Sequence, residues 1–261
     1  MDWLIGKSKK KDKEQNYLEN LQHIGSIKNK LPLYLEPCNC TTAFLSVSEI
    51  KELVFLPPGI NPKEWIALHT YYIFENVNLL YEVISEYCTP ITCPTMVGAG
   101  NVIYPWIDEK GKKTKLSAPL FVDHVMTSIQ KIILDENIFP TKYGNPFPPS
   151  FETQARKITR WLFQVTSHLY SSHYFQALGL QGIHSHLNTL FVHLLLAFSL
   201  EEPLSLLLSD NEPLAELATI LKVDGEKEVV VDGFDTIPRD VETEEKIQST
   251  FKGDEVREET N

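Results

Sequence analysis

Cysteines and long apolar runs are both scarce in this 261-residue sequence. Four cysteines are too few for a disulfide-stapled scaffold. The most apolar stretch, residues 187–200, is interrupted by Asn188 and His193 and falls short of the roughly 20 residues that cross a bilayer. The N-terminus carries a lysine run in place of the apolar segment of a secretion signal. We therefore expect neither secretion nor a membrane span, and interpret residues 187–200 as a buried helix.

Sequence motifs of catalysis are also missing. The chain has no HExxH, no GxSxG and no Walker loop, and the VGAG at residues 97–100 lacks the third glycine of a dinucleotide site. Cys88 or Cys93 could act as a nucleophile only with an orienting acid and an oxyanion hole, and no such groups occur at a recognisable spacing. These absences favour a binding domain over an enzyme.

The net charge of −11 is unevenly distributed. Residues 1–30 hold seven lysines and four acids, residues 223–261 hold thirteen acids and five bases, and residues 31–222 carry a net charge of −6. We expect a flexible basic arm, a folded domain over residues 31–222, and an acidic tail with too little apolar material to order. An acidic body repels phosphate backbones, so nucleic acid is not an expected partner and a basic protein segment is.

Apolar periodicity predicts a mainly helical domain. The clearest helix begins at Asn61, which can cap it in a box with Glu64, and continues with two apolar stripes as the central helix of a bundle. Residues 31–60, rich in proline-bounded apolar runs, are expected to be extended, and the alternation before the turn at Asp108 predicts a small β-hairpin. Further helices are predicted over residues 119–134, 150–178, 184–200 and around 214–221.

Two pairs of side chains have the spacing of structural zinc ligands. Cys88 and Cys93 follow the central helix, and His168 and His173 lie near the end of a later helix. Two thiolates and two imidazoles fill the four tetrahedral positions of zinc, so such a site would be closed and structural.

Two other interpretations of these four residues remain open. Free cysteines and single histidines are often ordinary buried residues. Five residues of an ideal helix also rotate a side chain by roughly 140°, so His168 and His173 do not share one face. His184, His186 and His193 are therefore rival ligands.

Five segments, in order, resemble the signature segments of the Mob (phocein-fold) kinase-activator family. They are LPPGINPKEWIALHT, SEYCTPITCPTM, SAPLFVDHVMTSIQKIILDENIFPTKYGNPFP, LFQVTSHLYSSHYF and HSHLNTLFVHLLLAF. The likeness covers about residues 31–222, and MDWLIGKSKK together with YLEP and KELVFLP is most similar to the Mob-two subgroup.

The resemblance implies a helical bundle with one zinc ion and a non-catalytic coactivator. Such a protein binds the basic N-terminal regulatory region of an NDR-type serine/threonine kinase of the AGC class, in Hippo-like signalling that controls cell polarity and morphogenesis. The family's zinc ligands correspond to Cys88, Cys93, His168 and His173. Its kinase-binding residues correspond to Glu64, Trp65, Leu68, Phe139 and His186. From the residues alone, Glu64 could simply cap a helix and Trp65 could belong to the core.

One segment departs from the family pattern. Where the Mob-one subgroup has a basic cluster that reads phosphorylated peptides, this chain has KITRWLFQ. It keeps Lys157 and Arg160 but has Trp161 and Gln164 at the other cluster positions. Phosphate binding needs several converging cations, so it is not expected here. A scaffold subunit of a phosphatase-kinase assembly and a zinc hydrolase are the alternative functions. The family also implies a cytoplasmic location, with the nucleus, the cell cortex and sites of polarised growth as further expectations.

Overall fold

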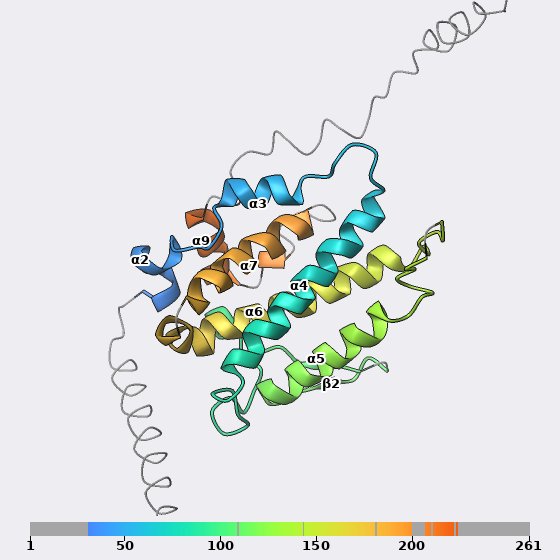
Figure 1. Ribbon diagram of the computed structural model, residues 1–261. Coiled ribbons are helices and arrows are strands. Elements are labelled where there is room, and N and C mark those ends of the chain that lie inside the picture. The colour runs from blue at the N-terminus through green and yellow to red at the C-terminus, as the bar shows by residue number, and fades with distance from the viewer. Residues whose placement is uncertain are drawn as a thin grey trace, which may run out of the picture. The chain divides into compact units, whose positions relative to one another are not determined.

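The helix α4, Pro62–Ile84, runs through the middle of the described structure and packs against α6 and α7 (Figure 1). The computed structural model describes residues 31–108, 110–142, 144–180, 182–199, 207–209, 211–221 and 223. The predicted basic arm, and the predicted acidic tail from residue 224 on, lie outside the described residues. All described residues belong to one compact unit, Met1–Gly225.

The start of α4 is capped as the sequence predicts, although in a different way. The side chain of Asn61 accepts a hydrogen bond from the backbone N–H of Lys63 at 2.9 Å, instead of the N–H of Glu64 that a capping box uses. Pro62 occupies the first helical turn, where its missing N–H has no partner to lose. The carboxylate of Glu64 is therefore left at an exposed position of the helix.

One of the two apolar stripes predicted on α4 forms the core, and the other does not. Ile73, Val77, Leu80 and Ile84 are buried. The second stripe lies on the side of α4 that faces away from α6 and α7. Together the two stripes make the apolar face of the helix wide, and so the sequence pattern predicted a helix packed on all sides.

The other predicted helices are present. They are α5, Ala118–Ile133, α6, Phe151–Gly179, α7, Ile183–Ser199, and α9, Glu212–Ile220. Each turns its apolar face into one core, with α6 in contact with α4, α5 and α7. The mainly α class is thus confirmed. None of the helices among the described residues is both long and apolar enough to span a membrane.

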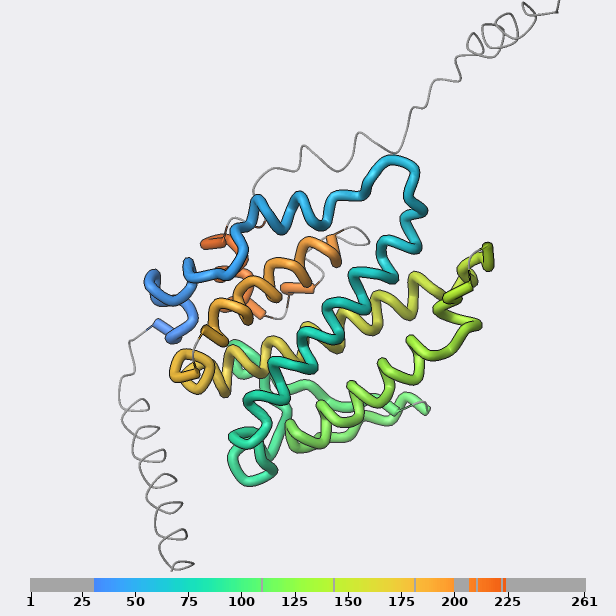
Figure 2. The backbone as a smooth tube through the Cα atoms, viewed as in Figure 1, coloured from blue at the N-terminus to red at the C-terminus, as the bar shows by residue number. Residues whose placement is uncertain are grey.

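The prediction of an extended segment over residues 31–60 is wrong. This segment contains the 3-10 helix η1, Leu33–Leu35, and two short α-helices, α2, Pro37–Cys40, and α3, Val47–Val54. Helix α3 begins with a complete capping box in which the side chains of Ser46 and Glu49 each bond the other's backbone N–H. It lies alongside α7, as the path of the chain in Figure 2 shows.

The predicted hairpin is present. Strand β1, Trp106–Ile107, pairs antiparallel with β2, Lys113–Thr114. The Asp108 side chain accepts from the N–H groups of Lys110 and Lys112 at 2.9 Å each, which closes the turn between them. A second 3-10 helix, η2, Ala99–Asn101, lies in the loop that leads from α4 to the hairpin.

Candidate functional site

The two cysteine ligands predicted for zinc lie in a tight loop that follows α4. The hydroxyl of Thr92 donates to the carbonyl of Tyr87 at 2.7 Å, and the N–H of Cys93 donates to the carbonyl of Thr89 at 2.8 Å. These bonds turn the chain back on itself, so Cys88 and Cys93 both point into the interior and both are buried.

The two histidine ligands project from α6, which is a continuous helix at this point. Both are buried, and their ring centroids are 5.0 Å apart with an interplanar angle of 76°. The rotation of about 140° between positions 168 and 173 does not separate them, because each imidazole reaches sideways to a point between the two side chains. The objection raised by the spacing therefore does not hold in the folded chain.

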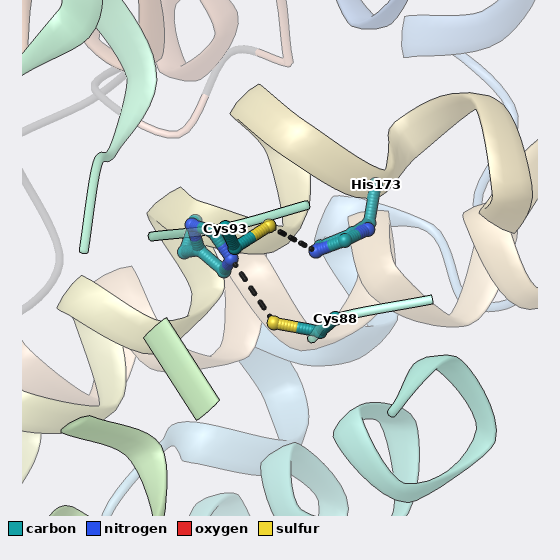
Figure 3. A group of neighbouring side chains, drawn as sticks. Cys88, Cys93 and His173 are labelled. Atoms are coloured by element: carbon teal, nitrogen blue, oxygen red, sulfur yellow. Dashed lines mark hydrogen bonds between the residues drawn. The ribbon is translucent and has the colours of Figure 1, made fainter. Parts of the chain in front are cut away.

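Figure 3 shows Cys88, Cys93 and His173 turned toward one point, and the donor atom of His168 belongs to the same group. Cys88 Sγ lies 3.5 Å from His168 Nε2, and Cys93 Sγ lies 3.4 Å from His173 Nε2. All four donor atoms lie within 4.8 Å of one another. Sulfur at about 2.3 Å and nitrogen at about 2.0–2.1 Å from a tetrahedral zinc ion would be about 3.5 Å apart. The arrangement fits a tetrahedral divalent ion of this size.

The protonation chemistry of the cluster also suits a cation. The pKa of Cys93 is lowered, chiefly because the Cys88 thiol hydrogen-bonds to it. The same bond and burial raise the pKa of Cys88, so the second proton is hard to remove without a compensating positive charge. His168 Nδ1 lies 2.7 Å from the carbonyl oxygen of Val97, and donating there leaves Nε2 as the lone-pair atom facing the sulfurs.

The rival histidines do not join this cluster. His193 bonds to His69, and His186 stacks on Phe44. His184 lies in the first turn of α7. Among the described residues, the Cys88, Cys93, His168 and His173 group is the one set of three or more such side chains whose donor atoms converge.

The residues predicted to bind a kinase lie in two groups. Glu64 and Leu68 are exposed near the start of α4, and Trp65 between them is half-buried. The indole N–H of Trp65 donates to the carbonyl of Val54 at 2.9 Å, which ties α4 to the end of α3. Trp65 is thus neither a free surface residue nor a full member of the core.

His186, a residue of α7, lies near the start of α3. It is exposed on α7 and stacks on the exposed ring of Phe44 at 4.8 Å. The N–H of Phe44 donates to the Thr189 hydroxyl at 2.8 Å, which fixes the chain just before α3. Phe139 is in neither group: it is buried and packs edge-on against Phe151 at 5.1 Å. The structure therefore gives Phe139 a packing contact and no exposed ring.

Apolar periodicity predicts a central helix with two apolar stripes, but one of these stripes on α4 is exposed. Leu68, Tyr72, Leu79 and Val83 are 40% to 57% exposed. At 100° per residue they fall within about 60° of one another around the helix, and Glu64, Glu75 and Glu82 lie along one flank. We call these seven residues the α4 face. The acidic flank, which a core helix would not carry, was the signal that could have distinguished it.

The segment KITRWLFQ forms an aromatic stack where the Mob-one subgroup has its basic cluster. Trp161 stacks on Trp106 at 5.7 Å, and Lys157 Nζ lies 4.7 Å from the centroid of the Trp161 ring. Arg156 Nη2 approaches Glu152 at 3.7 Å. Lys157 therefore contacts an aromatic ring, and Arg156 contacts an acid.

Fold and site together define a class: a helical domain with one buried Cys2His2 centre that joins a loop to a helix 80 residues away along the chain. A sequence profile of the Mob1/phocein family matches residues 42–202. The chain belongs to this family, which confirms the resemblance seen in its sequence.

Named relatives point to the same family. MOB kinase activator 2 of Homo sapiens is 44% identical over 214 residues, which are 81% of this chain and 85% of that protein. Maintenance of ploidy protein mob2 of Schizosaccharomyces pombe is 36% identical over 173 residues, 66% of this chain and 70% of that protein. MOB kinase activator-like 2 of Drosophila melanogaster is 52% identical over 162 residues, 62% of this chain. The matched segment spans only 28% of the fly protein's length.

Proposed function

We propose that this protein is a non-catalytic coactivator that binds the basic, helical N-terminal regulatory region of an NDR-type AGC kinase through the α4 face. Relatives named as MOB kinase activators support a kinase partner. The observation that carries the assignment to this surface is the exposed stripe of Leu68, Tyr72, Leu79 and Val83. In this proposal the protein acts in the cytoplasm and nucleus, including sites of polarised growth.

The chemistry of the α4 face matches an amphipathic basic helix. From Leu68 to Val83 the stripe extends about 22 Å, the length of a helix of about 15 residues. Burying each large apolar side chain on such a partner contributes about 1.5–3 kcal/mol before the costs of association. The flanking Glu64, Glu75 and Glu82 steer a lysine- or arginine-rich segment and disfavour an acidic one.

We further propose that the Cys2His2 centre holds one structural zinc ion. The ion would join the loop after α4 to α6 and so fix the C-terminal end of the helix that carries the α4 face. All four tetrahedral positions would be taken by protein donors, which leaves no place for the water that a zinc hydrolase activates.

Kinase activation in this proposal needs no chemistry by the chain. A segment that folds on the α4 face can favour the active arrangement of the kinase if that arrangement binds more tightly than the inactive one. The protein then shifts a population by differential affinity. This separates a coactivator from a passive scaffold of a phosphatase-kinase assembly, which would bind both arrangements equally.

The test is binding of a fluorescent peptide from the basic N-terminal region of an NDR-type kinase to the full chain, measured by anisotropy. Leu79→Glu is expected to weaken binding at least about 10-fold, since it places a charge in the apolar stripe. Leu134→Glu is the matched control, because Leu134 is an exposed leucine just past the end of α5. Equal affinity of the two variants would reject the α4 face, and absence of binding by the wild-type chain would reject the partner.

A further inference from the structure

A pair of histidines joins α4 to α7 beneath the N-terminal end of the α4 face. His69 Nδ1 and His193 Nε2 are 2.8 Å apart, and His69 is 2% exposed. The two rings are nearly perpendicular, at 86°. This pair belongs to neither the metal centre nor the exposed residues, and the proposed function gives it no role.

The pair continues directly into Trp65. The imidazole of His69 contacts the indole edge-to-face, with the centroids 4.7 Å apart and an interplanar angle of 75°. The indole N–H then donates to the carbonyl of Val54, the last residue of α3. A single chain of contacts therefore links α7, α4 and α3 through His193, His69, Trp65 and Val54.

Packing alone does not account for a buried pair of histidines at this position. Burial lowers the pKa of both histidines, and His69 lowers that of His193 further, so the pair is neutral at pH 7 and one ring must donate to the other. His69 Nε2 is buried without a hydrogen-bond partner among the described residues. An unsatisfied buried nitrogen is destabilising, whereas two aliphatic side chains of similar volume would avoid that effect. We therefore look for the role of the two imidazoles in the side chain that they contact, Trp65.

We propose that His69, oriented by its hydrogen bond to His193, is the positioning residue that sets the indole of Trp65 at the partner-binding end of α4. The inference rests on the proposed function for the effect on partner binding, and on the structure alone for the position of the indole. His193 acts only through His69, so it can be changed without altering a residue of the α4 face.

The test compares two replacements of His193. Glutamine places an amide near the position of the imidazole Nε2 and keeps a partner for His69. Leucine has a similar volume but no polar atom. The chain has four tryptophans, and the Trp65 indole signal is assigned in an NMR spectrum by its loss in Trp65→Phe. The readouts are the solvent exchange rate of that indole N–H and the affinity for the basic kinase peptide.

We expect His193→Leu to raise the exchange rate and the Kd about 10-fold each, and His193→Gln to stay within about 3-fold of the wild type. His124→Leu is the control, because His124 stacks on a different indole, that of Trp106, at 5.2 Å. If His193→Leu leaves the Trp65 signal unchanged, the positioning role is rejected. If His193→Leu does not fold, His69→Asn takes its place in the same two measurements. This variant keeps a polar atom for His193 but removes the ring that contacts Trp65.

A wild-type chain that does not bind the peptide would reject the proposed function. The indole exchange rates would still decide whether His69 positions Trp65. A changed exchange rate with unchanged peptide affinity would overturn the part of the inference that concerns the partner.

Discussion

The Cys2His2 centre and the α4 face are both connected to α4, yet their side chains are arranged in opposite ways. The centre gathers four buried side chains whose polar atoms face one another. The α4 face presents apolar side chains to solvent with acids beside them. Buried polar atoms must have partners, so the first arrangement stabilises the isolated chain. Exposed apolar atoms gain little until a partner covers them, which is why we propose the second as an interaction surface. The comparison predicts that changes at the centre affect folding and changes at the face affect binding.

The largest effect is expected from removing a metal ligand. Cys93→Ser should abolish stoichiometric zinc and unfold the domain or lower its Tm strongly, because structural zinc sites contribute about 10–16 kcal/mol of binding energy in zinc-finger peptides, against a total stability of about 5–15 kcal/mol for a typical domain. Zinc content and thermal melting measure this. Cys38→Ser is the control, since Cys38 is an exposed cysteine that does not belong to the cluster. A Cys93→Ser protein that still bound one zinc ion per chain would show that Cys93 is not a zinc ligand.

Two adjacent leucines of α4 sharpen the same comparison. Leu80 is 8% exposed and belongs to the core, whereas Leu79 is 57% exposed and belongs to the α4 face. Leu80→Ala should cost about 2–5 kcal/mol of unfolding free energy, and Leu79→Ala about 0.5 kcal/mol or less. For the kinase peptide only Leu79→Ala should weaken binding directly. Urea unfolding and peptide titration of both variants test this, and equal losses of stability would show that the two faces are not distinct.

The two sites differ in how far the sequence predicted them. The spacing of the two cysteines and of the two histidines made Cys88, Cys93, His168 and His173 candidates, and the family resemblance assigned all four. Spacing alone left His184, His186 and His193 open, since helical rotation argues against His168 and His173 sharing one face. The length of the imidazole side chain and the loop at Thr89 and Thr92 resolve this, and neither can be read from periodicity.

The surface and the N-terminal segment were harder to predict. Periodicity reports where apolar residues recur, not what covers them. By this pattern alone the stripe with Tyr72 and Leu79 looked like core, and only the family resemblance gave Leu68 a role in binding. In residues 31–60, prolines on either side of short apolar runs concealed α3, although Ser46 and Glu49 form a capping box. A helix of eight residues shows only two turns of periodicity, so its cap is a stronger signal than its pattern.

The pH dependence of stability tests the His69–His193 pair independently of the Cys2His2 centre and the α4 face. The folded pKa of His193 is lowered from 6.5 to about 4, mainly by burial and then by His69. Between these values the unfolded chain binds a proton that the folded chain does not. The free energy of unfolding is therefore not reduced by His193 above pH 6.5. It decreases as the pH falls toward 4, by about 3 kcal/mol in all. The slope should be shallower in His193→Gln, measured by urea unfolding at several pH values. Parallel slopes would contradict the burial of a neutral histidine.

The smallest expected effect lies in the capping box of α3, which connects the two groups of predicted kinase-binding residues. Ser46→Ala removes the acceptor for the N–H of Glu49 and should cost about 1 kcal/mol. Because α3 supplies the Val54 carbonyl to the Trp65 indole, fraying of its start should reach Trp65 only weakly. Glu52→Ala is the control, at an exposed position of the same helix away from the cap. Thermal melting should rank Ser46→Ala below Glu52→Ala, with both retaining zinc and most of the peptide affinity. A Ser46→Ala variant that lost peptide binding while keeping its stability would make the start of α3 part of the interaction surface.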